Sequence, residues 1–386
     1  MIEIIAIVLL LLLLNCLLVQ VLYYLFILTK LAFYKSDNRN QTDLQPLSLI
    51  IAARNEYDNL EKHLSQILEQ DHPNYEVVVV NDCSWDQTGT LLERLQTQYP
   101  HLKIVTLHEQ EKYPKGKKFA LTMGIKAASN ELLVFTDADC RPTSKQWLRN
   151  MASNFTSGKE LVLGYSPYRK VAGFLNLFIR FETFMTGVQY LSFALLRDAY
   201  MGVGRNLAYR RSLFFAVKGF GSHNHLLSGD DDLFVNEAAT PSNVAIEVRK
   251  NSFMISEPKQ TLAGWRKQKR RHLSTGKLYQ PRHKFWLGLF NTTHILFHLL
   301  ILASIILIPF MEPTKKHLIS EMDFGYILVG VWLCRWLVQT SVLYPSMKKL
   351  NDITLIFLLP ILDWMYSFYL FVFGIMSFFT KPKTWD

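Results

Sequence analysis

Two acidic residues separated by one position have the types and spacing that a bound metal ion requires. Asp137 and Asp139 flank Ala138, and in an extended segment residues at i and i+2 point to the same side of the chain. Two carboxylates placed in this way can approach Mg²⁺ or Mn²⁺, hard cations that substrate phosphates commonly help to coordinate. The pair therefore predicts a donor that carries a diphosphate group. An acid that closes a strand is also a common turn former, so the choice depends on where the pair lies in the fold.

A second acidic cluster runs from Gly229 through Asp230, Asp231 and Asp232 to Leu233. Mutual repulsion should raise the pKa of at least one of these carboxyl groups toward the range of a general base. An acidic cap followed by the first turn of a helix would give the same pattern. Both interpretations stay open on spacing alone.

Two basic segments have the composition to contact phosphate. Lys115-Gly116-Lys117-Lys118 leads into an apolar helix whose first amides can bind an anion, or it is simply a solvated helix start. Residues 265–272 carry five cations in eight positions and precede a membrane segment, where anionic lipid attracts such a run. The sequence lacks a Walker loop and lacks G-x-G-x-x-G after its first strand, which argues against P-loop and dinucleotide sites.

The elements that must position these residues alternate between strand and helix. Four apolar runs have the pattern of buried strands, and three amphipathic runs between them have the pattern of helices. This order is typical of an α/β domain with a mostly parallel sheet. The predicted strands are Leu47–Ala53, Glu76–Val80, Leu102–Leu107 and Glu131–Thr136, and the predicted helices are Asn59–Gln70, Gln87–Gln98 and Lys117–Ser129.

Polar side chains gather where the predicted strands end. In an open parallel sheet the ligand binds outside the carboxyl ends of the strands. Three strand ends agree here, which weakens the interpretation of any one acid as a mere turn former. The residues in question are Arg54, Asn55 and Glu56 after the first strand, Asn81 and Asp82 after the second, and Asp137 and Asp139 after the fourth.

Composition and long uncharged runs indicate an integral membrane protein. Of the 386 residues only 19% are charged and 49% are hydrophobic, which excludes a disordered chain and argues against a wholly soluble one. Four runs exceed the ~20 residues of a bilayer crossing. They lie between Glu3 and Lys30 and over Phe285–Met311, Phe324–Met347 and Ile353–Thr380. A signal peptide would begin with basic residues and end at a small-residue cleavage site, unlike the first run.

Basic residues beside these runs predict their orientation. Lys30 and Lys35 follow the first run, and Lys277 and Lys284 precede the second, so the positive-inside rule places the intervening segment in the cytoplasm of a multi-pass protein. We therefore expect a membrane helix over 1–34, a cytoplasmic domain over 35–260, a basic interfacial segment over 261–284 and three membrane helices over 285–380. The four cysteines are widely spaced and fit a reducing compartment better than zinc or disulfides.

Two charges interrupt the membrane runs. Arg335 and Asp363 each lie near the middle of a span, and consecutive spans are antiparallel, so the two can meet at similar depth. We predict a buried ion pair, because a lone charge there costs at least ~2.5–3.5 kcal/mol. The alternative is that each side chain faces a water-filled cavity or the lipid headgroups.

The stretch from Val171 to Leu196 is apolar and aromatic around Arg180 and Glu182. Its charges make it a poor membrane span but suit a helix that lies in the interface, beside which a lipid acceptor can enter. Packing in the core of the domain is the alternative.

In combination these motifs resemble those of membrane-bound family 2 glycosyltransferases with a GT-A catalytic domain, such as ceramide glucosyltransferase and the cellulose, chitin and hyaluronan synthases. The resemblance covers residues ~47–272 in the family's order. The matching pieces are Ala53-Arg54-Asn55-Glu56, Val79-Val80-Asn81-Asp82, Lys115-Gly116-Lys117, Asp137-Ala138-Asp139, Gly202-Val203-Gly204-Arg205-Asn206, Gly229-Asp230-Asp231 and Gln268-Lys269-Arg270-Arg271.

The resemblance implies a role for each matching residue on the donor side. Glu56 and Asp82 correspond to contacts with the base and ribose of a nucleotide-sugar donor, which we expect to be a UDP-sugar. Asp137 and Asp139 correspond to the metal pair, with Asp139 the direct ligand of Mg²⁺ or Mn²⁺. The remaining donor contacts are assigned to Arg54, Asn55 and Lys117.

On the reacting side, Asp230 corresponds to the general base and Asp231 is the substitute candidate. Gln268 and Arg271 correspond to the element that covers the donor diphosphate. Acceptor contacts are assigned to Gly204, Asn206 and His272.

The implied reaction is a single displacement with inversion, moving a sugar to a membrane lipid, with no nucleic acid involved. Gly229 replaces the family's Glu, and His272 replaces a Trp that is typical of processive synthases. The second departure weakens, without removing, the alternative of a polysaccharide synthase. A membrane component that binds sugar nucleotides without catalysis is the other alternative.

Overall fold

The computed structural model describes residues 2–36, 44–109, 116–226, 228–273, 275–311 and 321–379. The chain divides into two compact units. The helical unit comprises Met1–Phe33, Gln280–Lys348 and Asp352–Phe379. Among the described residues, the α/β unit comprises Tyr34–Tyr279 together with Lys349–Asn351, so most of the predicted interfacial segment belongs to it.

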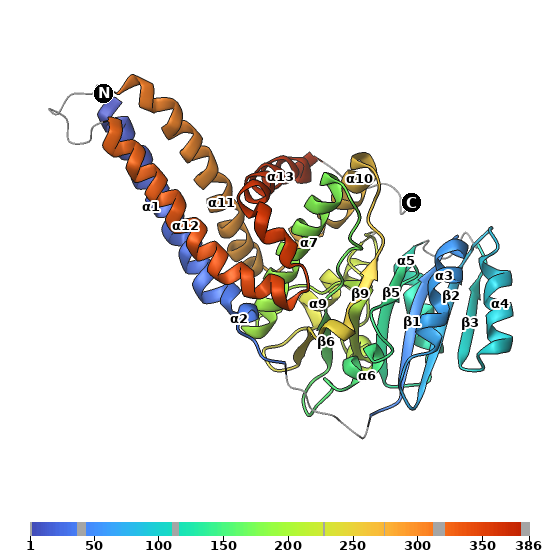
Figure 1. Ribbon diagram of the computed structural model, residues 1–386. Coiled ribbons are helices and arrows are strands. Elements are labelled where there is room, and N and C mark those ends of the chain that lie inside the picture. The colour runs from blue at the N-terminus through green and yellow to red at the C-terminus, as the bar shows by residue number, and fades with distance from the viewer. Residues whose placement is uncertain are drawn as a thin grey trace. The chain divides into compact units, whose positions relative to one another are not determined.

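The α/β unit is built on a seven-stranded sheet with the strand order β3-β2-β1-β4-β7-β6-β8 (Figure 1). The first four strands in the chain are parallel, as predicted, and the sequence missed only the shorter strands beyond them. The strands are β1 (Leu47–Ala53), β2 (Tyr75–Asp82), β3 (Leu102–Leu107), β4 (Leu132–Asp137), β6 (Leu161–Gly164), β7 (Leu207–Arg210) and β8 (Val244–Glu247). Strand β7 is antiparallel to both of its neighbours, β4 and β6.

Helices connect the parallel strands and bury one face against the sheet. Helix α3 buries Leu60, Leu64, Ile67 and Leu68, the i, i+4, i+7 spacing of an amphipathic helix. The other helices of the unit are α4 (Thr88–Gln98), α5 (Lys117–Ala127), α6 (Trp147–Ala152), α7 (Phe174–Leu195), α8 (Arg211–Ala216), α9 (Asp232–Ala238) and α10 (Leu262–Leu273), with α3 spanning Tyr57–Leu68. A separate two-stranded sheet pairs β5 (Cys140–Pro142) with β9 (Met254–Ser256).

Helix α7 corrects the expectation of an interfacial helix. Most of its side chains are buried, including Arg180 and Glu182. Lys269 forms an ion pair with Glu182, and the Tyr190 hydroxyl donates to the Gly164 carbonyl at 2.6 Å. The ion pair of Glu182 with Lys269 is buried, and so are most of the aromatic rings of α7. Helix α7 is therefore a core helix, which is the alternative that the sequence left open.

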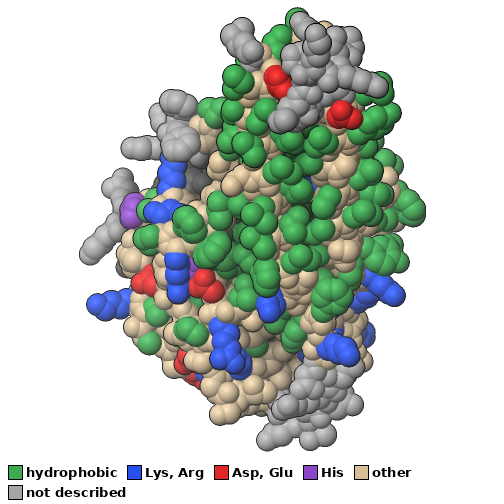
Figure 2. Space-filling view, turned by 90° about the vertical axis from the view of Figure 1, so that its left-hand side faces the viewer, with side chains coloured by type: hydrophobic (Ala, Val, Ile, Leu, Met, Phe, Trp, Pro, Cys, Tyr) green, Lys and Arg blue, Asp and Glu red, His purple; other side chains and the backbone are tan. Residues whose placement is uncertain are grey.

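The helical unit contains four helices long and apolar enough to cross a membrane, at Ile2–Ala32, Pro281–Phe310, Met322–Lys349 and Ile353–Met376. They match the four predicted spans. Side chains on the face seen in Figure 2 are mostly hydrophobic over these helices, and residues such as Leu11, Ile306 and Phe368 are more than half exposed. Helix α1 (Ile2–Tyr23) continues through a π-helical turn into α2 (Thr29–Ala32), and the others are α11 (Pro281–Leu307), α12 (Glu321–Lys349) and α13 (Leu359–Phe379).

The predicted intramembrane ion pair is confirmed. Arg335 Nη1 lies 2.5 Å from Asp363 Oδ2, and Nη2 lies 3.3 Å from Oδ1. His298 Nε2 is 3.0 Å from the same carboxylate, and Gln339 donates to it at 2.5 Å. Gln339 also donates to the Tyr24 hydroxyl at 3.1 Å, so side chains from four segments of the unit meet around one carboxylate.

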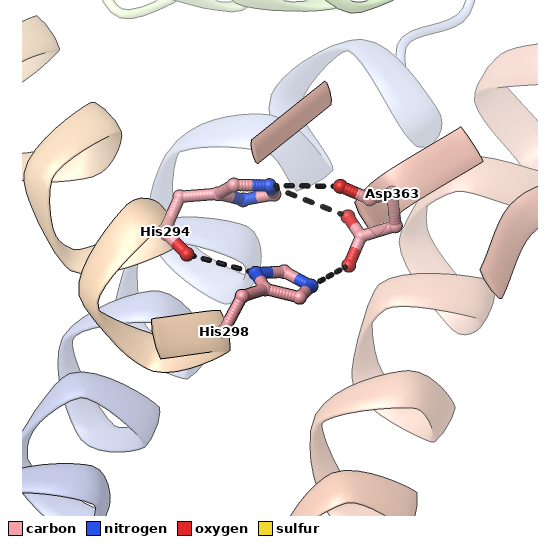
Figure 3. A group of neighbouring side chains, drawn as sticks. All are labelled: His294, His298 and Asp363. Carbon is pink, nitrogen blue, oxygen red and sulfur yellow. Dashed lines mark hydrogen bonds and ion pairs between the residues drawn. The ribbon is translucent and has the colours of Figure 1, made fainter. Parts of the chain in front are cut away.

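His294, His298 and Asp363 have ligand atoms close enough to hold a metal ion (Figure 3). The Arg335 guanidinium, however, bonds both oxygens of Asp363 and donates to His294 Nδ1 at 3.1 Å. A metal cation would have to displace this guanidinium or lie beside its positive charge, which Coulomb repulsion opposes. We therefore interpret the group as a polar network that packs the helices together.

Candidate active site

The sheet register brings the predicted polar residues to one edge. Ala53 pairs with Asn81, and Ala52 pairs with Asp137, so β1, β2 and β4 end at the same level. Parallel strands whose ends align in this way present the loops that follow them on one side of the sheet. This edge therefore carries the candidate site.

Asn55 braces the loop after β1 against the loop after β2. Its backbone N–H donates to Ser84 Oγ at 3.0 Å, and its side-chain oxygen accepts from the Trp85 N–H at 3.0 Å. Asn55 and Cys83 both have φ of 54°, a left-handed conformation that Asn tolerates better than most residues. The side chain of Asn55, a residue predicted to contact the donor, thus shapes the loop.

Glu56 lies in the loop after β1 and is half-buried, and Asp82 is the last residue of β2 and is buried. Burial raises the pKa of Asp82, while the nearby charge of Arg54 opposes the rise. Burial also raises the pKa of Glu56, and the Asn59 amide donates to its carboxylate at 2.6 Å. Asp82 Oδ2 is buried and has no hydrogen-bond partner within the residues described.

The Asp137–Asp139 pair lies at the end of β4, as predicted. Burial and then the charge of Asp137 raise the pKa of Asp139. The Cys140 thiol donates to Asp139 Oδ1 at 3.3 Å. A divalent cation would relieve the repulsion between the two carboxylates, and their oxygens are the ligands that Mg²⁺ and Mn²⁺ prefer, so the residues present fit such an ion.

Lys117 joins the metal pair to the second acidic cluster. Its Nζ lies 2.7 Å from Asp137 Oδ1 and 2.9 Å from Asp230 Oδ2. Gly116, with φ of +138°, directly precedes Lys117 at the start of α5. The three side chains line one hollow together with Gly204. Lys115 of the predicted basic turn lies outside the described residues.

The three adjacent acids have different ionisation, as repulsion predicted for at least one of them. Burial and then the charges of Asp230 and Asp232 raise the pKa of Asp231 to about 7. Burial also opposes ionisation of Asp230, but its ion pair with Lys117 outweighs this effect and lowers its pKa. Asp230 lines the hollow, whereas both Asp231 oxygens accept backbone N–H groups, from Gly204 at 2.7 Å and from Asp232 at 2.8 Å.

Asn206 is buried and fully hydrogen-bonded, which contradicts its assignment to the acceptor. Its amide donates to the Tyr165 and Ser252 carbonyls, each at 2.9 Å. Its side-chain oxygen accepts from the Trp147 indole at 3.0 Å. With no exposed surface and with both side-chain groups bonded, Asn206 holds the core together. Gly204, by contrast, lines the hollow.

The basic segment contributes helix α10, which carries the three other predicted residues. Gln268 Oε1 accepts from the Tyr168 hydroxyl at 3.5 Å. Arg271 is half-buried and His272 is exposed.

Two cations near the site were missed by the sequence reasoning. Arg205 stacks over the Tyr168 ring at 4.5 Å, and its charge lowers the pKa of Asp139. Lys118 Nζ donates to the His223 carbonyl at 2.6 Å, in the loop that leads to Asp230. Both residues belong to motifs that the sequence analysis quoted. Only their tertiary contacts distinguish their roles from those of the neighbouring residues in the motifs.

Part of this chain is similar to known glycosyltransferases. The model of the family described as Glycosyl transferase family 2 matches residues 48–216. Glycosyltransferase AglE of Haloferax volcanii is 32% identical over 188 residues, which are 48% of this chain and 58% of that protein. The poly-beta-1,6-N-acetyl-D-glucosamine synthase of Staphylococcus epidermidis is 31% identical over 31% of this chain and 28% of that protein. The chain thus aligns with less than two thirds of either relative.

A solved structure extends the likeness to nearly the whole chain. Mannosyltransferase PcManGT from Pyrobaculum calidifontis, solved in complex with GDP-Man and Mn²⁺, has a TM-score of 0.56 at 19% identity and covers 96% of this chain and 99% of its own. A likeness at this identity shows the fold. It confirms the predicted GT-A architecture with one N-terminal and three C-terminal membrane helices.

Proposed function

Because residues 48–216 form a family 2 glycosyltransferase domain, we propose that this protein is an inverting, metal-dependent glycosyltransferase. Its donor is a nucleotide-diphosphate sugar and its acceptor is a membrane lipid. The observation that carries the proposal is the position of Lys117, whose ammonium group contacts Asp137 of the metal pair and Asp230 of the base cluster. The two halves of a displacement reaction therefore share one hollow.

The charges of the hollow suit departure of a diphosphate. When bound to Asp137 and Asp139, a divalent cation neutralises charge that develops on the leaving group. Lys117 and Arg271 supply further positive charge for the same oxygens. Asp230 takes the proton of the acceptor hydroxyl, and Asp231 stays a structural cap because backbone N–H groups occupy both its oxygens.

Lys117 also links donor binding to the strength of the base. In the absence of donor, its ion pair lowers the pKa of Asp230. A donor phosphate that draws the ammonium group away removes this effect, and the remaining burial raises the pKa of Asp230. The carboxylate becomes a stronger base only when a donor is present, which disfavours proton removal without transfer.

The lipid acceptor is supported by the composition of the chain. The four apolar helices, which are long enough to cross a membrane, support a membrane location, and the basic residues beside them support a cytoplasmic position for the α/β unit. A lipid with a free hydroxyl or phosphate oxygen is an acceptor available to such an enzyme. The match to a polysaccharide synthase supports a second candidate, a processive enzyme, which would release products of many sugars instead of one.

The test uses purified full-length protein in detergent with UDP- and GDP-sugars, Mn²⁺ and a membrane lipid extract. We expect nucleotide release together with a glycolipid that carries one added sugar, and loss of both in Asp230→Asn. Asp58→Asn, the same change at an exposed position on α3, is the matched control. Absence of nucleotide release with every donor, and no difference between the two variants, would leave only a binding protein.

A further inference from the structure

The third acid of the cluster, Asp232, points away from the hollow. It is 7% exposed, and its Oδ1 accepts from the Leu233 N–H at 2.8 Å. Its Oδ2 accepts from the Tyr279 hydroxyl at 2.8 Å and contacts the Thr275 hydroxyl. Asp232 opens α9, two residues after Asp230, whereas Thr275 and Tyr279 follow α10. The side chain therefore joins two distant segments of the α/β unit.

A count of hydrogens indicates the form of this carboxyl group. Thr275 Oγ1 also lies 2.8 Å from the His272 carbonyl, so three contacts share the two hydrogens of Thr275 and Tyr279. A proton on Asp232 supplies the third, because it can donate to Thr275 while Thr275 donates to His272. Burial raises the pKa of Asp232, in agreement with this count. The other titratable groups that act on it are Asp230, Asp231 and Lys118.

The segment held by Asp232 is the one that carries Gln268 and Arg271. Helix α10 packs on α7 through the Trp265 ring, 5.7 Å from the Phe178 ring, and through the ion pair of Lys269 with Glu182. After α10 the chain passes Thr275 and Tyr279, which are buried. The helix is thus attached to α7 along its length and to the base cluster just beyond its end.

We propose that protonated Asp232, with Thr275 and Tyr279, forms a latch that holds the donor-covering helix α10 in a fixed position relative to the base Asp230. This inference rests on the proposed function for the roles of α10 and Asp230. Asp232 is a positioning residue, because it contacts neither the hollow nor the reacting atoms. Opening of the latch would weaken binding of the donor and displace the base at the same time.

The first measurement is limited tryptic cleavage of the full-length protein, which does not depend on activity. Helix α10 and the segment after it contain the trypsin sites Arg266, Lys267, Lys269, Arg270, Arg271 and Lys277. We expect Asp232→Ala and Tyr279→Phe to speed cleavage there about fivefold, the effect of one lost buried hydrogen bond on local opening. Asp232→Asn should speed cleavage less than Asp232→Ala, because its amide can donate to both hydroxyls although the Tyr279 hydrogen loses its acceptor.

The second measurement is the dissociation constant of UDP and of GDP, each with Mn²⁺. We expect Asp232→Ala and Tyr279→Phe to weaken nucleotide binding about fivefold and Asp232→Asn to weaken it less than Asp232→Ala. Tyr75→Phe is the matched control, because it removes a hydroxyl that donates to the Leu68 carbonyl at 2.6 Å, at the start of β2 and away from the site. It should lower the melting temperature without changing cleavage or nucleotide affinity.

Each outcome decides one proposal. Unchanged cleavage in both Asp232→Ala and Tyr279→Phe would overturn the latch. Equal damage in Asp232→Asn and Asp232→Ala would overturn it too, since it would show that a charged carboxylate is required. Wild-type protein that binds neither nucleotide would overturn the proposed function, while the cleavage rates would still support or reject the latch.

Discussion

Removal of the Lys117 ammonium group should destabilise the protein in a way that depends on pH. Lys117→Met leaves Asp137 and Asp230 without their shared partner, and the side chains of Lys117 and Asp230 are only 20% and 10% exposed. Loss of one member of a buried ion pair costs ~3–5 kcal/mol. Asp137, at 30% exposed, is partly solvated, so we expect a loss at the lower end of this range, about 3 kcal/mol at pH 7.

The sign of the pH effect distinguishes this mechanism from poor packing. In the wild type the pKa of Asp230 is lowered, so the ion pair stabilises the fold at neutral pH and is lost as pH falls through the pKa of the folded state. In Lys117→Met the pKa of Asp230 rises above its ordinary value, and the variant should become more stable as pH falls from 7 to 5. The double variant Lys117→Met/Asp230→Asn should regain much of the loss at pH 7.

Thermal unfolding in detergent, followed between pH 5 and pH 8, measures these effects in the full-length protein. Lys126→Met is the control, because it removes a lysine that is exposed on the same helix. A loss of stability in Lys117→Met that is the same at pH 5 and pH 7, and that Asp230→Asn does not relieve, would refute the reasoning.

Three further predictions concern other charges. Burial lowers the pKa of Lys118 to about 8, so the wild type should gain stability relative to Lys118→Met as pH rises from 8 to 10, measured by thermal unfolding; a constant difference would contradict this. Arg335→Asp and Asp363→Arg should each reduce the amount of folded protein in membranes, because each unpaired charge costs ~2.5–3.5 kcal/mol. The double exchange should restore part of the folded protein. Additive losses in the double variant would argue against the ion pair. Chelation with EDTA should abolish transfer, and Mn²⁺ or Mg²⁺ should restore it in the wild type but not in Asp139→Asn, measured as nucleotide release.

Local sequence pattern predicted the parallel half of the sheet. In each strand and helix there, the apolar residues recur at the spacing that places their side chains on the buried face of that element. Strands β1 and β3 begin and end where the pattern placed them, and β4 differs by one residue at each end. Strands β6, β7 and β8, of which β7 is antiparallel to both of its neighbours, were not predicted. They are only four residues long, so too few positions repeat for a period to show, and pairing between distant segments defines them instead.

The site residues divide in the same way. The positions of Asp82 and Asp137 followed from the strand ends, since the carboxyl ends of aligned parallel strands meet at one edge. The role of Asn206 could not be predicted, because its partners Trp147 and Tyr165 come from segments whose proximity depends on packing. The burial of α7 was missed for the same reason, as an apolar helix with two charges suits either a membrane surface or a core that pairs those charges.

The amino-acid sequence by itself determined the class of the fold, the four apolar spans and the edge of the sheet that carries the candidate site, because these depend on short-range periodicity and on stretches of one composition. Only the tertiary structure decided which charges meet. Lys117 contacts Asp137 and Asp230, which are far from it and from each other in the chain, and Asp232 contacts Tyr279 instead of the hollow. Electrostatic pairing acts over a few ångströms in space, a distance that separation along the chain does not reveal.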